Sequence, residues 1–431
     1  MCGIFGVQGL HQAASVVHLG LYSLQHRGQE SAGIVAVDDD GNARVARKMG
    51  LVSDGFAGAT VGTLDGGLAI GHTRYSTAGS STIENAQPVL ARFRGGHIAL
   101  AHNGNLTNAT ELRRELEDQG SIFSSTMDSE VLVHRLAKAA SDAPEGKLAE
   151  ALQGVEGAYS LLVIIGNTLL VARDPRGWRP LVLGRLSDGA YVAASETCAL
   201  DIVGATVVRE VEAGEIIAID SNGLRSIKPF ERKELRRCVF EFVYFSRPDS
   251  RVFGGSVDRA RRALGRRLAL EQPALGAELV FSVPDSSNSA ALGFAEQSGL
   301  PLELALIRNH YVGRTFIQPT QAGRDAKVKV KYNAVREVLD GKSVVMVDDS
   351  IVRGTTTRGL VAMVRAAGAR EVHLRVSSAP ITGPCYYGID TPNREELIAA
   401  NMTTEQIGAH LGVDSLGYLS LDGMLESAPD G

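Results

Sequence analysis

The residue with the clearest capacity for covalent chemistry is Cys2, which directly follows Met1 and precedes Gly3. A small second residue permits removal of the methionine, so we expect a mature chain that begins at Cys2 with a free α-amine. That amine has a pKa of about 8 and the thiol one of about 8.5, so one residue would carry a nucleophile and its own general base. Taken alone, such a cysteine is more typical of a buried side chain beside an N-terminal strand.

Polar segments within the first 130 residues carry groups that could assist this nucleophile. Asn103 and Gly104 follow a short apolar run and supply an amide side chain and a glycine N–H, the two donors that an oxyanion hole requires. Individually, Arg74 is also typical of a surface ion pair, Asp128 of a helix N-cap, and the Asn-Gly pair of a tight turn. Their combination with an N-terminal cysteine favours a functional site.

The sharpest motif lies in residues 342–357, where an apolar run ends in Asp348 and Asp349 and a Gly/Thr loop then opens a helix. Backbone N–H groups at a helix start suit a phosphate monoester, and two carboxylates could accept hydrogen bonds from vicinal ribose hydroxyls. Ligands of open α/β sheets bind beyond the carboxyl ends of strands, where this loop would lie. An ordinary capped turn is the alternative, and no Walker loop is present. The candidate ligands are Asp348, Asp349, Ser350, Arg353, Gly354, Thr355 and Thr356.

The elements that must position the first set of residues are short strands and two helices. Apolar or alternating runs predict strands over residues 98–101, 160–165, 168–171 and 215–219. Three- and four-residue apolar spacing predicts helices over residues 108–119 and 127–140. This is the pattern of a mixed α+β layered domain. A strongly charged stretch at 230–237 suggests a boundary, and we therefore expect domains over 1–230 and 231–431.

Beyond this boundary, strands alternate with helices. Strands are predicted over residues 278–283, 302–307, 343–347 and 371–376, and helices over 257–271, 286–298 and 356–367. Such alternation predicts an α/β domain with a parallel sheet and right-handed crossovers. The long polar segment at 308–340 is typical of a functional lid or of a disordered loop.

Composition narrows the function classes. The 431 residues are 44% hydrophobic and carry a net charge of −5, so a real core is expected and a basic footprint for nucleic acid is not. No run of about 18 apolar residues and no signal-peptide pattern occurs. Four scattered cysteines do not form a disulfide framework. We expect a cytoplasmic protein with no nucleic-acid or membrane partner.

The motifs of the first half resemble the glutaminase domain of the class II glutamine amidotransferases, which are N-terminal-nucleophile (Ntn) hydrolases with an αββα sandwich. The resemblance runs over about residues 2 to 230. It implies that Cys2 attacks the side-chain amide of glutamine while Asn103 and Gly104 hold the oxyanion. It also implies that Arg27, Arg74 and Asp128 bind the glutamine substrate. Of these, Arg74 would bind its α-carboxylate and Asp128 its α-ammonium.

The motif at Asp348 resembles the phosphoribosyl-pyrophosphate (PRPP) loop of type I phosphoribosyltransferases, and residues 283–288 resemble the pyrophosphate loop of that fold. Together the two halves imply that ammonia from glutamine displaces pyrophosphate from PRPP, giving 5-phosphoribosylamine, the first step of de novo purine biosynthesis. Mg²⁺ is implied near Ser286, Asp348 and Asp349. Cations for the leaving group are expected in the polar segment, at Arg308, Arg314, Lys329 and Lys331. Related enzymes usually carry Lys at the position of Arg308 and Arg at the position of His310.

The resemblance also implies a homotetramer and feedback inhibition by purine nucleotides. One branch of the family holds a [4Fe–4S] cluster, and Cys238 and Cys385 stand where two of its ligands would be. Four thiolates are the normal requirement, so we expect no cluster in this chain and regard both cysteines as remnants. A cluster would be conceivable only if the natural chain continues past residue 431.

Two rival functions stay open at this point. A regulatory phosphoribosyl-binding protein would have no use for the nucleophile. Another class II amidotransferase, making glucosamine phosphate or asparagine, would share the first half alone and is disfavoured by the Asp348–Asp349 motif.

Overall fold

The structure, a computed structural model, describes residues 1–56, 61–75, 80–309, 330–391 and 393–429 and divides into two compact units. The first unit comprises Met1–Cys238, Arg251–Phe253 and Cys385–Asp390. The second comprises Val239–Ser250, Gly254–Pro384 and Thr391–Gly431. The chain therefore returns to the first unit twice after leaving it.

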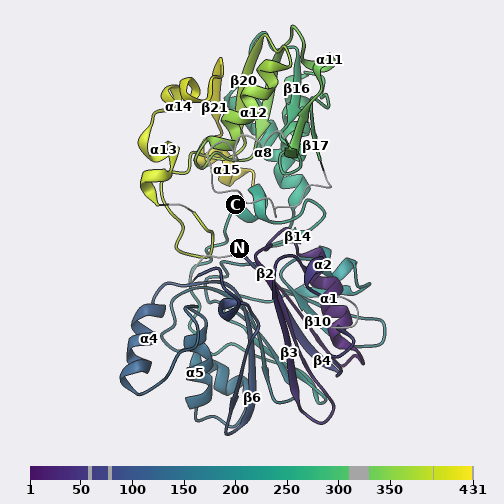
Figure 1. The fold of residues 1–431 in the computed structure, drawn as a ribbon, viewed down its shortest axis with the longest axis vertical. Coiled ribbons are helices and arrows are strands. Elements are labelled where there is room, and N and C mark those ends of the chain that lie inside the picture. The colour runs from purple at the N-terminus through teal and green to yellow at the C-terminus, as the bar shows by residue number, and fades with distance from the viewer. Residues whose placement is uncertain (57–60, 76–79, 310–329, 392, 430–431) are drawn as a thin grey trace. The chain divides into compact units, whose positions relative to one another are not determined.

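The first unit is built on two antiparallel sheets (Figure 1). The first sheet has the order β11-β9-β10-β1-β4-β2-β3, with β1 (Gly3–Gln8), β2 (Ser31–Val37), β3 (Ala43–Met49), β4 (Leu68–Arg74), β9 (Val182–Arg185), β10 (Tyr191–Ala194) and β11 (Thr206–Glu210). The second has the order β13-β12-β8-β7-β6-β5, with β5 (Val89–Phe93), β6 (Gly96–Leu106), β7 (Gly157–Ile165), β8 (Thr168–Arg173), β12 (Ile216–Asp220) and β13 (Gly223–Ile227). Strand β1 is central and pairs with both β4 and β10, which fixes the chain just after Cys2.

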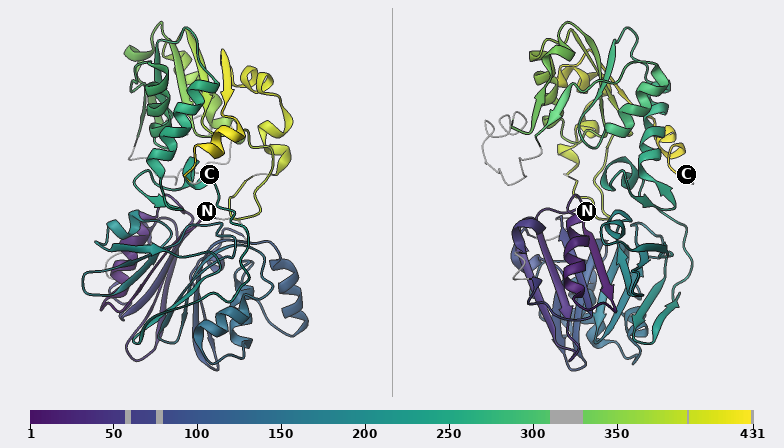
Figure 2. Two further views of the ribbon diagram at one scale, coloured as in Figure 1. Left: turned by 180° about the vertical axis from the view of Figure 1, so that it is seen from behind. Right: turned by 90° about the vertical axis from the view of Figure 1, so that its right-hand side faces the viewer.

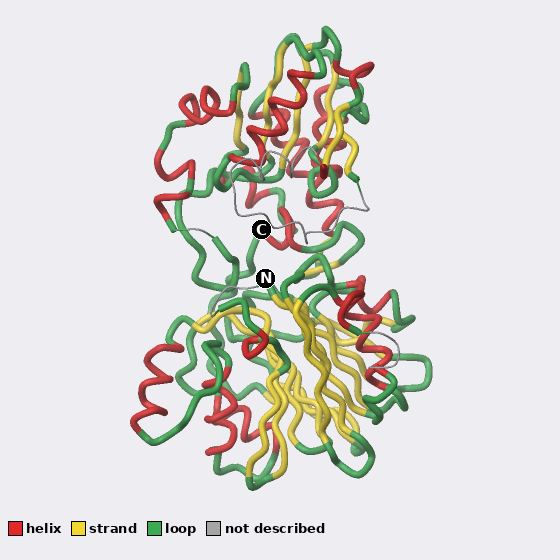
Figure 3. Tube along the Cα trace, in the orientation of Figure 1, coloured by secondary structure: helices red, strands yellow, loops and turns green. Residues whose placement is uncertain are grey.

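Helices cover the outer face of each sheet (Figures 2 and 3). Helices α1 (Ala13–Ser23), α2 (Val52–Gly55) and α7 (Cys198–Asp201) share a core with the first sheet, and α4 (Ala109–Asp118), α5 (Glu130–Lys138) and α6 (Pro144–Ala151) share one with the second. Strand β7 shows why the apolar runs are unbroken. Leu161 and Val163 pack toward the helices, whereas Leu162 and Ile164 enter the core between the sheets, because side chains alternate along a strand. The predicted αββα sandwich is confirmed.

The second unit contains a four-stranded parallel sheet of order β16-β19-β20-β21. Its strands are β16 (Leu279–Ser282), β19 (Ser343–Asp348), β20 (Glu371–Val376) and β21 (Ser415–Tyr418). Val345 and Val347 of β19 pack with α8 (Val257–Glu271) and α9 (Asn288–Ser298), whereas Val344 and Met346 pack with α12 (Thr355–Ala366) and α14 (Thr404–Leu411). Both faces of the sheet are thus buried, as parallel sheets require. The predicted α/β parallel-sheet domain is confirmed.

Short elements complete the described part of the chain. They are η1 (Ile83–Asn85), η2 (Glu241–Phe245), β14 (Arg251–Val252), β15 (Gly255–Ser256), β17 (Leu306–Arg308), β18 (Tyr332–Ala334), α11 (Arg336–Leu339), η3 (Arg394–Glu396), α13 (Ile398–Asn401) and α15 (Leu421–Glu426).

The prediction of a sheet strand over residues 302–307 is wrong. Leu302 forms an isolated bridge with Val280, and β17 pairs antiparallel with β18 instead. Val280 donates to the carbonyl of Pro301 and accepts from the N–H of Glu303, and the backbone of residues 305–308 then pairs with residues 332–335, so it does not extend the ladder with β16. Much of the predicted lid, with His310, Arg314 and Lys329, lies outside the described residues.

Candidate functional site

The candidate nucleophile is buried beside a buried amide. Cys2 is 6% exposed, its backbone nitrogen donates to Asn103 Oδ1 (3.2 Å), and its Sγ lies 3.6 Å from the carbonyl oxygen of Tyr75. Asn103 lies on β6 and is fully buried. Within the described residues, its Nδ2 has no hydrogen-bond partner. Burying a donor without a hydrogen-bond partner costs free energy of folding. The unpaired Nδ2 therefore indicates a donor that could bind an acceptor on a ligand.

Strand β6 fixes two further residues of the candidate site, Gly104 and Asp128. Gly104 has a φ of +148°, and a Cβ there would overlap the carbonyl oxygen of Ala158, so only glycine fits. Asp128 accepts from the N–H of Leu106 (2.8 Å) and from that of Ser129 (2.8 Å). Its side chain keeps 12% exposure. Asp128 is therefore both a turn-capping carboxylate and a group fixed next to the oxyanion candidates.

The arginines predicted to bind glutamine differ in their surroundings. Arg74 ends β4 and donates from Nη1 to Glu30 Oε1 (2.5 Å) and to the carbonyl of Ser80 (3.1 Å). Arg27 is fully buried, and its Nε donates to the carbonyl of Cys2 (2.9 Å). Arg27 thus holds the backbone of the nucleophile, and its contact with glutamine stays a prediction.

Sequence reasoning missed Glu196, the carboxylate that binds Arg27 and His26. Its Oε1 accepts from Arg27 Nη1 (2.5 Å) and lies 2.8 Å from His26 Nε2, and its side chain is fully buried. Burial alone would raise the pKa of Glu196, but the charges and hydrogen bonds of His26 and Arg27 outweigh burial and hold it well below its ordinary value. The available signal was a carboxylate two residues after the end of the apolar strand β10.

In the second unit, the structure brings together the two predicted phosphoribosyl segments. Asp348 ends β19, and both it and Asp349 are buried. Asp349 accepts hydrogen bonds from Ser350 Oγ (2.7 Å) and Ser286 Oγ. Asp348 Oδ1 accepts from the N–H of Asp349 (2.9 Å) and from Ser287 Oγ (3.4 Å).

Burial raises the pKa of both carboxyls. For Asp348 the neighbouring charge of Asp349 raises the pKa further, while Lys331 lowers it. For Asp349, hydrogen bonds from serine hydroxyls and the charge of Arg261 act in the lowering direction without cancelling burial. Burial therefore favours the protonated forms of this pair, and the residues around it supply too little positive charge to offset that effect.

Arg261 is a second residue that sequence reasoning missed. Its Nε donates to the carbonyl of Phe242 (2.7 Å), Nη2 to that of Ser246 (2.8 Å) and Nη1 to that of Ser286 (3.4 Å). It lies on the buried face of α8 between apolar positions, and this charge at an apolar helical position was its sequence signal. Arg261 braces the loop that carries Ser286.

The loop after Asp349 forms the start of α12. Gly354, with a φ of +75°, occupies the N-cap position, and Thr355 and Thr356 are exposed in the first turn. Arg353 is half-exposed and pairs with Glu396 (2.7 Å), an ordinary surface ion pair. Two hydroxyls near this edge are buried and, within the described chain, unpartnered: Ser378 Oγ and Tyr418 OH. Burial and then the charge of Asp348 raise the pKa of Tyr418 to about 12.

Two of the cations predicted for the leaving group, Arg308 and Lys331, lie in the described part of the chain. Arg308 pairs with Asp285 of the pyrophosphate-like loop. The Nζ of Lys331 lies 4.9 Å from the ring centroid of Tyr332, whose hydroxyl donates to the carbonyl of Pro284 (3.1 Å). Both cations therefore belong to the surroundings of the Asp348 loop.

The oxygen-rich donor set of Ser286, Asp348 and Asp349 fits Mg²⁺, which prefers hard oxygen ligands and keeps several waters. Across the described ranges, no group of three or more His, Cys, Asp or Glu side chains forms a complete metal cage. Cys238 and Cys385 both belong to the first unit.

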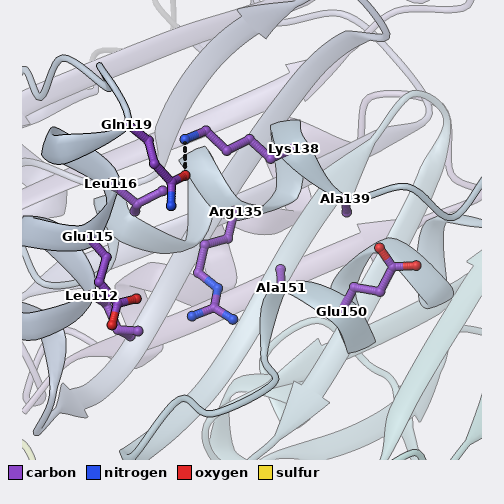
Figure 4. Close-up of a pocket in the computed structure, with 9 residues that line it drawn as sticks. All are labelled: Leu112, Glu115, Leu116, Gln119, Arg135, Lys138, Ala139, Glu150 and Ala151. Atoms are coloured by element: carbon purple, nitrogen blue, oxygen red, sulfur yellow. Dashed lines mark hydrogen bonds between the residues drawn. The ribbon is translucent and has the colours of Figure 1, made fainter.

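A surface pocket elsewhere in the first unit does not coincide with any predicted site residue (Figure 4). It has a volume of about 310 Å³ and lies among α4, α5 and α6. Its polar groups have protein partners, since Lys138 donates to Gln119 (2.9 Å) and Glu150 accepts from the N–H of Ala140 (2.7 Å). We assign no ligand to it.

Comparison with known proteins gives concordant relatives. A glutamine amidotransferase domain family matches residues 72–201. The amidophosphoribosyltransferase of Bacillus subtilis is 50% identical over 99% of this chain and 89% of its own length. The chloroplastic amidophosphoribosyltransferase 2 of Arabidopsis thaliana is 48% identical over 98% of this chain and 75% of its own length.

Solved structures agree with these relatives. The B. subtilis glutamine PRPP amidotransferase complexed with ADP and GMP superposes with a TM-score of 0.92 at 49% identity, covering 99% of this chain and 92% of that chain. A structure described as the allosteric regulatory enzyme of purine biosynthesis gives a TM-score of 0.93 at 49% identity, covering 99% and 91%. No helix in the described residues is long and apolar enough to cross a bilayer. The resemblance inferred from the motifs is confirmed: the chain belongs to the amidophosphoribosyltransferase family, glycosyltransferases with glutaminase activity that carry out the first step of purine biosynthesis.

Proposed function

We propose that Cys2 is the nucleophile that releases ammonia from glutamine and that Asn103 Nδ2 and the Gly104 N–H hold the resulting oxyanion. The observation that carries this assignment is the buried Nδ2 of Asn103, which has no partner among the described residues although Oδ1 of the same amide accepts from the backbone nitrogen of Cys2. Removal of Met1 would convert the nitrogen that now donates to Asn103 Oδ1 into an α-amine. That amine, held by the same amide, would take the proton from Sγ and return it to the leaving ammonia.

The glutamine substrate is a zwitterion, and the groups around Cys2 match it. Arg74 would pair with its α-carboxylate and Asp128 with its α-ammonium. Arg27 contributes by fixing the Cys2 carbonyl. These assignments follow the predicted division into a glutaminase over residues 1–230 and a transferase over residues 231–431, except that residues 231–238, Arg251–Phe253 and Cys385–Asp390 belong to the first unit.

In the transferase, Asp348 and Asp349 would accept hydrogen bonds from the ribose hydroxyls of PRPP. Ser350, Arg353, Gly354, Thr355 and Thr356 form the loop that would take the 5-phosphate at the start of α12. Arg308 and Lys331 would neutralise charge that develops on the departing pyrophosphate. When bound, Mg²⁺ would be held near Ser286, Asp348 and Asp349 and would supply further neutralisation of pyrophosphate charge.

The experiment that tests this function measures the products of one reaction mixture. With glutamine and PRPP together, we expect glutamate and pyrophosphate to be released in equal amounts, and intact-mass measurement to give a chain that begins at Cys2. Fully active enzyme that retains Met1 would contradict the α-amine assignment. Glutamate release without stoichiometric pyrophosphate would contradict the coupling to PRPP.

Regulation and assembly extend the proposal. The ADP- and GMP-bound relative supports purine nucleotides as feedback inhibitors here, and the family resemblance supports a homotetramer in the cytoplasm. Inhibition assays with ADP and GMP, and sedimentation of the pure protein, test the two points separately.

The hypothesis that this chain holds no iron–sulfur cluster rests on its cysteines. Cys2 is assigned to catalysis, and Cys198 is buried with its Sγ 3.7 Å from Glu196 Oε2. Cys238 and Cys385 alone are two short of the four thiolates normally needed. Iron and sulfide analysis after anaerobic purification should find essentially none, and about four irons per chain would refute the hypothesis.

A further inference from the structure

A short segment from late in the chain forms part of the glutaminase unit. Residues Cys385–Asp390, which we term the strap, belong to the first unit, although the residues on either side of them belong to the second. Upstream, the chain leaves β20, and the N–H of Ser377 donates to the carbonyl of Asp348 (2.9 Å). Eight positions later it reaches Cys385.

The strap touches the backbone of the oxyanion candidate. A Cβ built on Gly388 would lie 2.9 to 3.0 Å from the carbonyl carbon, Cα and oxygen of Gly104. Gly388 is buried and has a φ of +105°, so both space and backbone conformation demand glycine. Asn105 Nδ2 donates to the carbonyl of Tyr386 (2.9 Å), which ties the same strand to the strap.

Two side chains of the first unit fix the strap in place. Arg179, which is buried, donates from Nε (3.1 Å) and Nη2 (2.6 Å) to the carbonyl of Tyr387. The Tyr387 ring stacks on Trp178 with centroids 4.1 Å apart and an interplanar angle of 17°. An exposed loop that only covered the surface would not need a buried bidentate anchor of this kind.

We propose that Tyr387 and Gly388 are positioning residues of the glutaminase, which act by holding Gly104 where its N–H can stabilise the oxyanion. The proposal rests on the proposed role of Gly104. Small displacements of such a donor are expensive, because the donor must point to the place where charge develops and not to the ground-state carbonyl.

The test compares Gly388→Ala with Gly383→Ala, a neighbouring glycine whose added Cβ would meet nothing within 4 Å. For Gly388→Ala we expect kcat for glutamine hydrolysis to fall about 10- to 100-fold with little change in KM. The inhibition constant of glutamate γ-semialdehyde, whose adduct with Cys2 mimics the tetrahedral intermediate, should rise by a similar factor. Inhibition by the product glutamate, alkylation of Cys2 by iodoacetamide and ammonia-dependent synthesis should stay unchanged. Gly383→Ala should match the wild type in every assay.

Milder variants keep the test decisive if Gly388→Ala does not fold. Tyr387→Leu removes the stacking on Trp178 and should give a smaller loss of the same kind, while Tyr387→Phe keeps the ring and should restore activity. Equal glutaminase kcat in Gly388→Ala and Gly383→Ala, or equal loss of glutamine- and ammonia-dependent synthesis in Gly388→Ala, would overturn the inference. Cys2→Ala distinguishes this failure from a failure of the proposed function, since only the latter predicts persisting glutaminase activity in that variant.

Discussion

The proposed glutamine site and the proposed PRPP site differ in how their buried charges are balanced. Behind Cys2, the buried carboxylate of Glu196 meets Arg27 and His26, and its pKa lies well below the ordinary value. At the end of β19, two adjacent buried carboxyls meet mainly serine hydroxyls and each other, and their pKa values are raised. At the proposed glutamine site, protein side chains therefore neutralise the buried carboxylate. At the proposed PRPP site they do not, so a ligand with cations or hydroxyl donors would stabilise the carboxylates.

The difference in charge balance corresponds to different requirements of the two proposed reactions. A nucleophile must be positioned before the substrate arrives, and at Cys2 the backbone is held by Arg27 and Asn103 while Nδ2 of Asn103 has no partner among the described residues. A site for a polyanionic, metal-accompanied substrate benefits from unbalanced carboxylates, because the ligand contributes the missing positive charge or hydroxyl donors.

The largest expected effect is the loss of glutamine-dependent activity with ammonia-dependent activity retained. Cys2→Ala should lower glutamine-dependent synthesis by at least about three orders of magnitude, because the nucleophile is lost. Synthesis from high ammonium should stay within about twofold of wild type, since the PRPP site is untouched. Steady-state rates with each nitrogen source check this. Cys198→Ala is the matched control, and loss of both activities in Cys2→Ala would contradict the division of labour.

The second prediction concerns the internal charge balance of the glutamine site. Glu196→Gln leaves Arg27 buried without its carboxylate, and we expect the free energy of unfolding to fall by about 3–5 kcal/mol. Denaturant unfolding gives the value. Glu117→Gln, which breaks the exposed pair between Arg113 and Glu117, should cost about 0.5 kcal/mol or less. Similar losses in both variants would argue against a special role for the buried pair.

Carboxylate-to-amide changes at the proposed PRPP site should lower activity more than stability, the opposite of what we expect for Glu196→Gln. Asp348→Asn and Asp349→Asn should each cost about 1.5–3 kcal/mol in kcat/KM for PRPP with glutamine and with ammonia alike. Stability should not fall comparably, because burial and mutual repulsion already disfavour the charged pair. Glu337→Gln, an exposed change in the same unit, serves as control. Unchanged ammonia-dependent activity in both variants would refute the ribose assignment.

The smallest expected effect is a pH dependence that belongs to the glutamine site. Glu196 has an ordinary pKa of 4.5 and a lower one when folded, so its contribution to stability is present above pH 4.5 and declines as the pH falls below that value. The slope from this residue is at most about 1.4 kcal/mol per pH unit. Unfolding measured from pH 6 to pH 3.5 should show a shallower acid decline in Glu196→Gln. An identical decline would assign it to other carboxyls.

The residues that sequence reasoning found share a local signature. Asp348 and Asp349 follow an apolar strand and precede a Gly/Thr helix start, so adjacent residues carry the whole pattern. The parallel sheet was likewise predictable from the alternation of strands and helices, whereas the pattern of elements in the first half predicted a mixed α+β layered domain and the resemblance implied the αββα sandwich.

The residues that it missed depend on contacts between distant parts of the chain. Glu196 meets Arg27 across 169 positions, and the carbonyls that Arg261 braces belong to other segments. Strand β21 has only four residues, too few to show a period, and residues 305–308 of the predicted strand pair with residues 332–335 and not with the parallel sheet. Pairing across such separations leaves no spacing pattern for a single sequence to display.

The strap has a consequence for any attempt to separate the two halves. A polypeptide cut after residue 238 would keep both sheets of the sandwich but would lack Gly388 and the carbonyl that Arg179 binds. The glutaminase unit is thus discontinuous in the gene, and transplanting it onto another acceptor domain requires a graft of the strap as well as a choice of breakpoint. A natural or engineered fusion that omits those six residues would keep the proposed nucleophile but lose the segment that packs against Gly104 and binds Asn105.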